Sequence, residues 1–481
     1  MKNIKNILLI IVLLFILSGC KKNNEPIHVH TWAEATCDLP KQCTTCHKIE
    51  GEKAPHQFEW VVPENLKCNS NYIALNKCIK CGFVSEEEER FNDHKYIENI
   101  TVEPTCLEDG EKITTCENCD YYKTEVLKAN GHEVYYDVLR EPMNGECGYR
   151  VKCCKNCSFS GDSVAFVNNG FAYNGKLSVD GADLVNQYGE KFQLVGLSTH
   201  GLQWAHRFVN YDTFEALRNS FGINVIRLSL YTNEGGYCTS DEKTKEFLYQ
   251  TLANGIRIAT ELDMYVIIDW HMLGVGVPGA ENPLFYLTEA LQFFKRVTEE
   301  FKEYDNLLFD IMNEPSGDTT WKDCKEYANK VIPVIRENSD GIILVGNPKW
   351  SSDLNSVMGS PLTGYEDIMY TYHFYAGDRT SPVLLKRAYN AGIPVFVSEH
   401  GGMENTGDGP LYYDYIQLWW QELDKLNISY VAWNISNTGG SASIFKHGTS
   451  DIVDVSNSNL KEWGVYYRNH LRELLGLPEY R

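Results

Sequence analysis

The sequence predicts an α/β fold, a (β/α)8 barrel of the TIM type, preceded by small Cys- and His-rich repeats. Eight short apolar runs, rich in Val, Ile, Leu and Phe, have the pattern of buried parallel strands. Amphipathic helical patterns alternate with these runs. Polar residues end nearly every run, whereas a doubly wound open sheet would gather them at one crevice. The alternation and the polar ends together favour the barrel.

The predicted elements follow one another in strict order. The strands are expected at residues 192–200, 224–231, 265–271, 307–314, 342–350, 369–375, 394–399 and 430–437. The helices are expected at residues 212–221, 240–262, 285–304, 321–338, 381–390, 411–426 and 459–475. No Gly-rich dinucleotide fingerprint follows the first strand, which also argues against an open nucleotide-binding sheet.

Two carboxylates end two of the apolar runs. Glu314 lies in Asn313-Glu314-Pro315, and Glu399 follows the run that begins at Pro394. A charge at the last residue of a buried strand is costly unless it is paired or used, although a solvated strand end is the plain alternative for either one. Two such carboxylates from one sheet are what glycoside hydrolysis requires. The pair therefore predicts a glycosidase centre.

Other reactive or aromatic residues are expected at the same barrel mouth, where the C-terminal strand ends meet. They are His200, Arg227, His271, Asn313, His373, Tyr375 and Trp433. A single His or Tyr at such a position is more often a structural hydrogen-bonding group, but the whole set is hard to explain in that way. We expect Arg227 and Tyr375 to keep Glu399 ionised, and His373 to hydrogen-bond Glu314. Asn313 is expected to donate to a sugar 2-hydroxyl, and Trp433 to stack on a pyranose ring.

These motifs carry a family resemblance. Residues from about 174 to 475 resemble glycoside hydrolase family 5, and within it the bacterial endoglucanases. The matching segments are 196–204, 224–228, 266–271, 311–315, 373–376 and 397–399. The resemblance implies a retaining mechanism with Glu314 as acid/base and Glu399 as nucleophile, their carboxyl groups about 5–5.5 Å apart. It implies no cofactor for catalysis.

The resemblance also implies further substrate contacts. Trp204 would line a glycone-side subsite, Trp350 a leaving-group subsite, and Tyr231 would touch the sugar. Residues 175–194 resemble the hairpin that plugs the bottom of such barrels. The sequence departs from the family at two points. Residues 437–442 lack the Lys and Glu that bind distal glucosyl units, and His400 follows the nucleophile where relatives often have Trp.

The N-terminus predicts export. Lys2 and Lys5 precede eleven apolar residues, 7–17, a run too short to span a bilayer, which needs about 20 residues. Residues 17–20, Leu-Ser-Gly-Cys, resemble a bacterial lipoprotein cleavage box. That resemblance implies removal of residues 1–19, a lipid on Cys20, a tether at 20–27, and a membrane-anchored protein facing outside the cell. An ordinary signal peptide or an uncleaved anchor is the alternative.

Residues 28–165 contain an internal repeat. His30, His56, His94 and His132 follow one another at intervals of 26, 38 and 38 residues, and each precedes a Cys and a Cys-x-x-Cys pair. The cysteine sets are Cys37/Cys43/Cys46, Cys68/Cys78/Cys81, Cys106/Cys116/Cys119 and Cys147/Cys154/Cys157. Three Cys and the leading His of each unit satisfy a tetrahedral zinc site. Disulfides are the rival interpretation in an exported chain, but three Cys per unit leave a remainder.

The repeats have two candidate roles. Each unit is too small to bury much core and needs a metal or a bridge to fold. The units could be a spacer between the membrane and the barrel, or they could contact the cell wall through aromatic side chains. A third possibility is that the main function of the chain is to provide a metal-binding or adhesive surface.

The whole-chain prediction is a lipid-anchored endo-acting β-1,4-glucanase with its barrel at 166–481. The alternatives are the same chemistry on mannan, mixed-linkage glucan or xyloglucan, and a non-catalytic glycan-binding surface protein. The net charge of −21 argues against a nucleic-acid partner. The polysaccharide substrate and the membrane are the expected partners.

Overall fold

The structure is a computed structural model that describes residues 29–143, 146–450 and 452–480. The predicted signal peptide, Cys20 and the tether lie outside these residues. The chain forms two compact units, one ending at His132 and the other beginning at Glu133. In the part of the chain that is described, no helix has the length and apolar character that crossing a membrane requires.

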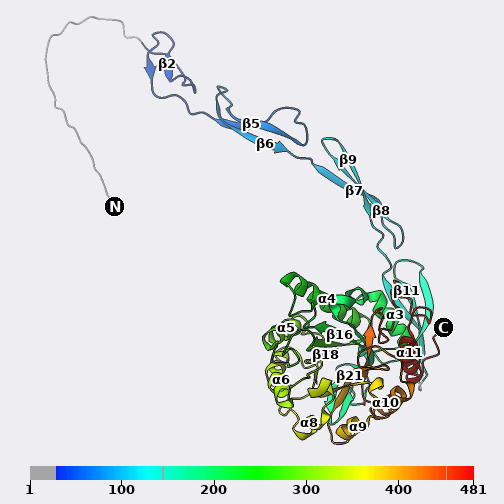
Figure 1. The fold of residues 1–481 in the computed structure, drawn as a ribbon. Helices are drawn as coiled ribbons and strands as arrows, with labels where there is room; N and C mark the ends of the chain where they lie inside the picture. The colour runs from blue at the N-terminus through cyan, green and yellow to red at the C-terminus, as the bar shows by residue number, and fades with distance from the viewer. Residues whose placement is uncertain (1–28, 144–145, 451, 481) are drawn as a thin grey trace, which may run out of the picture. The chain divides into compact units, whose positions relative to one another are not determined.

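The second unit contains the predicted barrel. Eight parallel strands close on themselves in the order β15 to β22 (Figure 1). Their bounds are β15 Val195–Thr199, β16 Val225–Tyr231, β17 Tyr265–His271, β18 Leu307–Asp310, β19 Ile342–Val345, β20 Ile368–Tyr375, β21 Val395–Gly401 and β22 Tyr430–Ile435. Each predicted strand is present, which confirms the (β/α)8 fold. Strands β18 and β19 end before their predicted ends.

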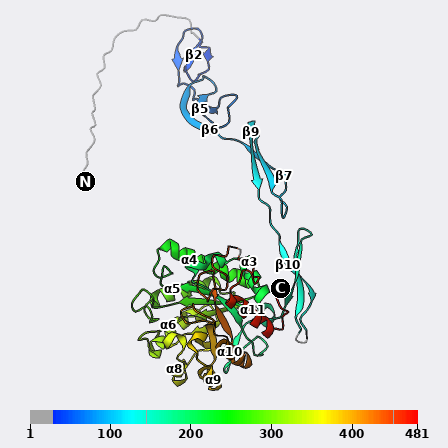
Figure 2. The same ribbon diagram turned by 45° about the vertical axis from the view of Figure 1, so that its right-hand side comes forward.

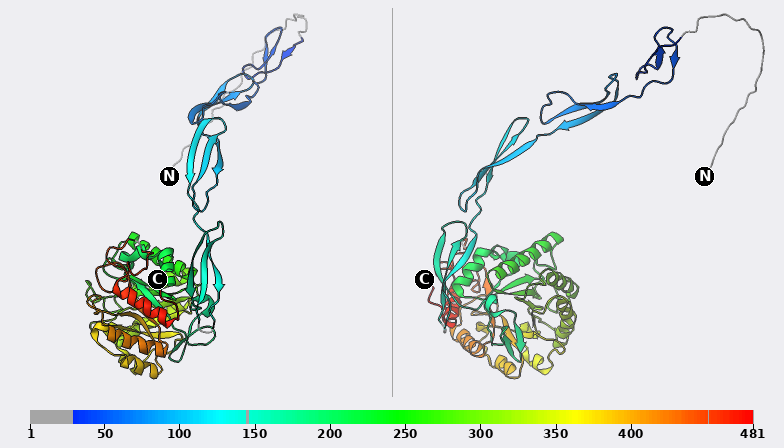
Figure 3. Two further views of the ribbon diagram at one scale, coloured as in Figure 1. Left: turned by 90° about the vertical axis from the view of Figure 1, so that its right-hand side faces the viewer. Right: turned by 180° about the vertical axis from the view of Figure 1, so that it is seen from behind.

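Helices surround the strands, as both views of Figure 3 show. The long helices are α3 Tyr211–Phe221, α4 Glu242–Glu261, α5 Leu287–Glu300, α6 Trp321–Arg336, α9 Val383–Asn390, α10 Tyr413–Leu426 and α11 Glu462–Leu474. Asn210, Asp241 and Thr320 cap α3, α4 and α6 by accepting a hydrogen bond from the backbone three residues on. The sequence did not predict the short helices α1 Phe171–Asn174, α2 Leu202–Ala205, η1 His206–Phe208, α7 Pro348–Ser351, α8 Leu354–Gly359 and η2 Ala376–Asp378.

The barrel has two apolar cores. A large one lies between strands and helices, and a smaller one fills the barrel interior. The interior core includes Leu177, Leu184 and Leu194, which pack with strand residues such as Val225 and Tyr265. Leu177 and Leu184 come from the hairpin of β13 Ser178–Asp180 and β14 Asp183–Val185. Residues 175–194 therefore plug the barrel as predicted.

The sheet of the last repeat belongs to the same unit as the barrel. It consists of β10 Val134–Arg140, β11 Gly148–Cys154 and β12 Ser160–Phe166. Tyr136 Oη donates to Glu215 Oε1 on α3 at 3.1 Å, and Lys152 pairs with the same carboxylate at 2.5 Å. Arg150 donates to Asn219 Oδ1, also on α3, at 3.1 Å. These partly buried polar contacts hold the sheet against α3.

The first unit consists of three small antiparallel sheets, each with three strands (Figure 2). Their strands are β1 Trp32–Ala33, β2 Lys41–Cys43 and β3 Ile49–Glu50; β4 Phe58–Val61, β5 Ser70–Cys78 and β6 Val84–Asn92; and β7 Tyr96–Val102, β8 Gly110–Cys116 and β9 Cys119–Leu127. The buried apolar residues of 29–132 are Cys37, Cys43, Ala74, Cys78 and Cys116. Cysteine side chains thus form most of the interior of this unit.

Candidate active site and cysteine clusters

Glu314 has the environment of a general acid. It lies four residues beyond the end of β18, and its Oε1 is 2.9 Å from His373 Nδ1 on β20. Burial raises the pKa of Glu314 to about 8; the positive charge of Arg227 opposes the rise, and the negative charges of Asp269 and Asp310 add to it. Glu314 is therefore protonated at neutral pH.

Glu399 on β21 has the environment of a nucleophile. Arg227 Nη1 donates to its Oε2 at 3.0 Å, and Tyr375 Oη donates to its Oε1 at 2.7 Å. Both hydrogen bonds fix the orientation of the carboxyl group. Arg227 and Tyr375 therefore occupy the positions predicted for them.

The two carboxyl groups are close to each other. Oxygen atoms of Glu314 and Glu399 and a ring nitrogen of His373 all lie within 4.8 Å of one another. Retaining glycosidases hold their carboxyl groups about 5–5.5 Å apart, while inverting enzymes keep them about 6.5–9.5 Å apart to admit a water. The observed spacing fits attack by one carboxylate on the sugar itself.

Arg227 is the centre of a buried ionic network. Its Nη2 lies 3.1 Å from Asp269 Oδ2 and 3.2 Å from Asp310 Oδ2, and it donates to Asn313 Oδ1 at 2.6 Å. Burial raises the pKa of each aspartate to about 6, against the lowering effect of Arg227. Neither aspartate was predicted as a site residue. For Asp269 the sequence does contain a clue, because Asp269 lies two residues before His271 and therefore points to the same face of β17.

Asn313 is fixed by more than Arg227. Its Nδ2 lies 3.2 Å from the Met272 carbonyl oxygen and 3.3 Å from His271 Nε2, and the side chain is fully buried. His271 Nδ1 in turn lies 2.7 Å from Asp269 Oδ2. Burial lowers the pKa of His271 well below its usual value. The contact of Asn313 with a sugar 2-hydroxyl stays a prediction.

Aromatic rings gather on one side of the mouth. Tyr231 stacks on His271 with ring centroids 4.1 Å apart, and Trp433 stacks on the same imidazole at 5.4 Å. His200 lies 5.4 Å from Trp433 and 5.1 Å from Trp204. Trp204 is 47% exposed, whereas Trp433 is only 7% exposed. Trp204 thus offers sugar far more open surface than Trp433.

A cleft of about 1070 Å³ lies beside Glu314. Glu314, His373 and Tyr375 line it together with Trp350, which is 59% exposed. Further lining residues that were not predicted include Glu281 and Asn405 in loops, Lys349 in α7 and Asp378 in η2. Residues in loops and in such short helices give no periodic signal.

The carboxyl centre does not suit a metal ion, although its three ligand atoms lie close enough together to meet one. The guanidinium of Arg227 is 3.0 Å from Glu399, so a cation at this carboxylate would face a fixed positive charge. His373 uses its second nitrogen as well, 2.9 Å from Ser398 Oγ. These contacts fit proton transfer rather than metal binding.

The two departures from the family pattern have local explanations. His400 is fully buried, with Nδ1 2.8 Å from the Val431 carbonyl oxygen and Nε2 accepting from Trp420 Nε1 at 3.1 Å. The loop after β22 is held by Lys461, whose Nζ donates to the carbonyl oxygens of residues 438, 439 and 440 at 2.9, 2.8 and 2.6 Å. The role of Lys461 in this loop was not predicted, because Lys461 caps the start of α11 and is distant from residues 438–440 in the sequence.

The cysteine clusters form, but not in the predicted sets. One group consists of Cys37, His56, Cys78 and Cys81, and a second of Cys68, His94, Cys116 and Cys119. At the N-terminal end His30, Cys43 and Cys46 form a group of three. The prediction that each site lies within one unit is therefore wrong. Cys147, the first cysteine of the last set, belongs to none of the clusters among the described residues.

The antiparallel topology explains the error. Within each sheet the leading His precedes the first strand, and the Cys-x-x-Cys pair lies at the turn between the second and third strands. Both therefore lie at the same end of the sheet. The first Cys lies in the first turn, at the opposite end. It therefore meets the ligands of the following repeat. The cysteines of residues 29–143 and 146–450 are free thiols, so no disulfide joins them here.

Comparisons with known proteins agree with this site. Residues 185–439 match the family Cellulase (glycosyl hydrolase family 5). An endoglucanase A of Butyrivibrio fibrisolvens is 40% identical over 306 residues, which is 63% of this chain and 70% of that protein. Among solved structures, a cellulase designated Cel5C_n superposes with a TM-score of 0.60 at 36% identity, covering 64% of this chain and 95% of that one.

The catalytic domain of a Thermobifida fusca endoglucanase superposes with a TM-score of 0.57 at 33% identity, over 63% of this chain and 99% of that domain. A variant of that domain has been solved in complex with cellotetraose. The family match spans more than half of this chain and includes both carboxylates. The chain therefore belongs to glycosyl hydrolase family 5, the cellulase family.

Proposed function

We propose that this protein is an endo-acting β-1,4-glucanase that hydrolyses cellulose or related β-glucan by double displacement. The observation that carries this is the pair of carboxyl groups with oxygens within 4.8 Å of each other, one with a raised pKa and one that accepts hydrogen bonds from Arg227 and Tyr375. The relatives named endoglucanases supply the substrate class.

The geometry gives each carboxyl group one task in each half of the reaction. Glu399 attacks the anomeric carbon while Glu314 gives its proton to the glycosidic oxygen, which leaves with the aglycone. Glu314, now ionised, takes a proton from water, and that water releases the sugar from Glu399. His373 Nδ1 lies 2.9 Å from Glu314 Oε1 and orients that carboxyl group.

The substrate contacts support an extended glucan rather than a small glycoside. Trp204 and Trp350 are both exposed, and Trp350 lines the long cleft beside Glu314. Flat aromatic faces suit pyranose rings. We assign Trp204 to the glycone side and Trp350 to the leaving-group side. Mannan, mixed-linkage glucan and xyloglucan are the alternative substrates, because loop 437–442 has no charged side chain with which to bind distal sugars.

Reducing-sugar release from carboxymethylcellulose, barley β-glucan and glucomannan tests the proposal. We expect release from the first two to exceed release from the third, and we expect Glu399→Gln to abolish it. Glu404→Gln serves as the matched control, since Glu404 also belongs to the segment that follows β21 but accepts a hydrogen bond from Tyr412 Oη. Normal glycan binding without release from any substrate would favour a non-catalytic glycan-binding protein.

We propose further that the protein is exported and anchored to the membrane by a lipid on Cys20, with its barrel outside the cell. The support is the leader sequence alone, and Cys20 lies outside the described residues. Detergent partitioning of the whole protein, with Cys20→Ser beside it, tests this. Equal partitioning of the two proteins into the aqueous phase would overturn it.

For the repeats we propose zinc binding and a spacer role. Three thiols and an imidazole suit zinc in number and kind. Cell-wall contact is the alternative role, and Trp60, Tyr96 and Tyr122 are exposed enough to serve it. A peptidoglycan and glycan pull-down with the full chain and with Trp60→Ala/Tyr96→Ala/Tyr122→Ala separates the two roles. Binding that the triple variant loses would replace the spacer role by wall contact.

A further inference from the structure

In the first two repeats, the first cysteine is held beside the start of the next repeat by hydrogen bonds to the carbonyl oxygen of the residue before it. The amide of Ala54 donates to the Thr36 carbonyl oxygen at 3.0 Å, and Thr36 adjoins Cys37. One repeat later, Asn92 Nδ2 donates to the Lys67 carbonyl oxygen at 3.0 Å, and Lys67 adjoins Cys68. Ala54 and Asn92 each lie two residues before the next leading histidine. The connecting segment thus brings each cysteine to the histidine that follows it.

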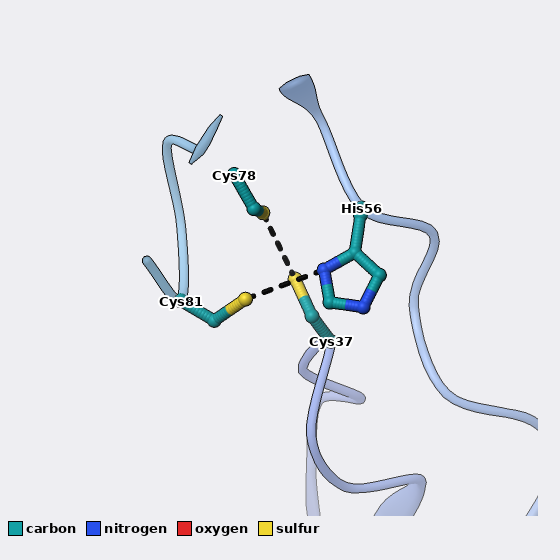
Figure 4. A group of neighbouring side chains, drawn as sticks. All are labelled: Cys37, His56, Cys78 and Cys81. Carbon is teal, nitrogen blue, oxygen red and sulfur yellow. Dashed lines mark hydrogen bonds between the residues drawn. The ribbon is translucent and has the colours of Figure 1, made fainter. Parts of the chain in front are cut away.

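The ligand atoms have the spacing of a tetrahedral metal site. Cys37 Sγ lies 3.7 Å from Cys78 Sγ, and Cys81 Sγ lies 3.3 Å from His56 Nδ1 (Figure 4). In the next group Cys68 Sγ lies 3.7 Å from Cys116 Sγ. Zinc with bonds of about 2.3 Å to sulfur and about 2.0 Å to nitrogen places two sulfurs about 3.8 Å apart, and sulfur and nitrogen about 3.5 Å apart. A disulfide would need about 2.05 Å.

The second group repeats this geometry with the same atoms. Cys119 Sγ lies 3.4 Å from His94 Nδ1, as Cys81 lies from His56. Each group takes one thiol from a first turn, and an imidazole and two thiols from the sheet that follows. The pattern recurs although the sheets differ in strand length. It is therefore a property of the repeat rather than an accident of one loop.

We propose that one zinc ion joins the first repeat to the second and another joins the second to the third, each with one thiolate from the earlier repeat and an imidazole and two thiolates from the later one. This rests on the zinc binding proposed above and specifies which residues share an ion. The buried apolar residues of 29–132 are mostly these cysteines, so the ions stand in for a hydrophobic core. The stability of residues 29–132 then depends on the contacts between neighbouring repeats, as in repeat proteins.

Alkylation mapping of the full chain tests which residues share an ion. In Cys37→Ser we expect one zinc fewer per chain and faster alkylation of Cys78 and Cys81, while Cys43 and Cys46 react at the wild-type rate. Cys68→Ser should shift the effect by one repeat, to Cys116 and Cys119. Cys153→Ser, which removes a thiol outside the clusters formed by residues 29–143 and 146–450, is the matched control and should change neither quantity.

The outcomes separate the two proposals. Faster alkylation of Cys43 and Cys46 in Cys37→Ser, with zinc present in the wild type, would overturn the shared sites and keep zinc binding. A wild-type chain without zinc, purified without chelator, would overturn both. Unchanged glucan hydrolysis shows that the barrel is intact in each variant.

A second experiment leaves every ligand in place, in case a substitution unfolds a whole repeat. A protease site inserted at residues 51–53, between the first two sheets, allows the chain to be cut there. We expect the two fragments to elute together until a chelator removes zinc, because Cys37 and the ligands of the next repeat hold one ion. Fragments that separate while zinc is still bound would contradict the proposal.

Discussion

At the scale of single residues, the two carboxyl groups differ because their neighbours differ. Glu314 is buried near two aspartates, and this favours its protonated form. Glu399 accepts hydrogen bonds from Arg227 and Tyr375, which hold its carboxyl group in one orientation. Pairs of carboxyl groups separated in this way can divide the roles of acid and nucleophile.

The pH dependence follows from Glu314. Because the acid must be protonated to act, we expect kcat/KM to fall about tenfold per pH unit above a pKa of about 8. Folding takes up a proton wherever the folded pKa exceeds the unfolded value of 4.5, so the free energy of unfolding falls as pH rises from about 4.5 to 8. Glu314→Gln should flatten that decline in urea titrations. A decline of the same slope in the variant would contradict this account of Glu314.

Arg227 supports a second prediction. Arg227→Met leaves Asp269, Asp310 and Glu399 buried without their cation, so we expect the free energy of unfolding to drop by about 3–5 kcal/mol. The same change removes the hydrogen bond that orients Glu399 Oε2, so kcat should fall as well. Arg227→Lys, which keeps the charge, is the control and should lower the free energy of unfolding less. An Arg227→Met protein as stable as the wild type would be evidence against this role.

Two carboxylates that follow apolar runs were predicted from the sequence, and two that stand within the predicted runs were not. Glu314 and Glu399 stand out because a charge follows an apolar run. Asp269 and Asp310 stand within such runs, where strand patterning alone does not separate a buried ion from a solvated one. Their role depends on Arg227, which comes from a different strand, and a single sequence does not show that contact.

At the scale of elements, periodicity predicted the strands and long helices but not the loops. Apolar runs identify a strand because burial on both faces leaves few polar positions. The short helices α7 and α8 and the loop after β22 have no such pattern. Lys461 donates hydrogen bonds to three carbonyl oxygens of the loop after β22, although it belongs to the start of α11.

Lys461 should therefore stabilise the loop rather than act on substrate. Lys461→Met removes three hydrogen bonds from a charged donor, and we expect the free energy of unfolding to fall by about 1–3 kcal/mol. Its kcat on short cello-oligosaccharides should stay near that of the wild type. Lys322→Met, an exposed lysine on α6, is the control and should change neither quantity. A large loss of kcat with unchanged stability would instead place Lys461 in the substrate site.

At the scale of the whole molecule, the repeats and the barrel rely on different forces. The barrel has two extended apolar cores, while residues 29–132 bury little besides cysteine. The repeat, its ligand types and its period could be predicted from the sequence. The pairing of ligands could not, because it depends on which end of each sheet a turn occupies.

Metal removal should affect the repeats but not the barrel. We expect a chelator to leave glucan hydrolysis unchanged, since the carboxyl centre holds Arg227 rather than a metal ligand set. The same treatment should make residues 29–132 sensitive to protease, because metal binding contributes to the folding of small metal domains. Readdition of zinc should restore protection. Hydrolysis that falls in step with zinc loss would contradict this independence.

The most direct test of the central claim is the anomeric form of the first product. Proton NMR during hydrolysis of cellopentaose, recorded before mutarotation, reports that form. Carboxyl groups within 4.8 Å predict double displacement, so the β-anomer should appear first and convert slowly to α. Initial release of the α-anomer would show inversion and would contradict the assignment of Glu399 as the nucleophile.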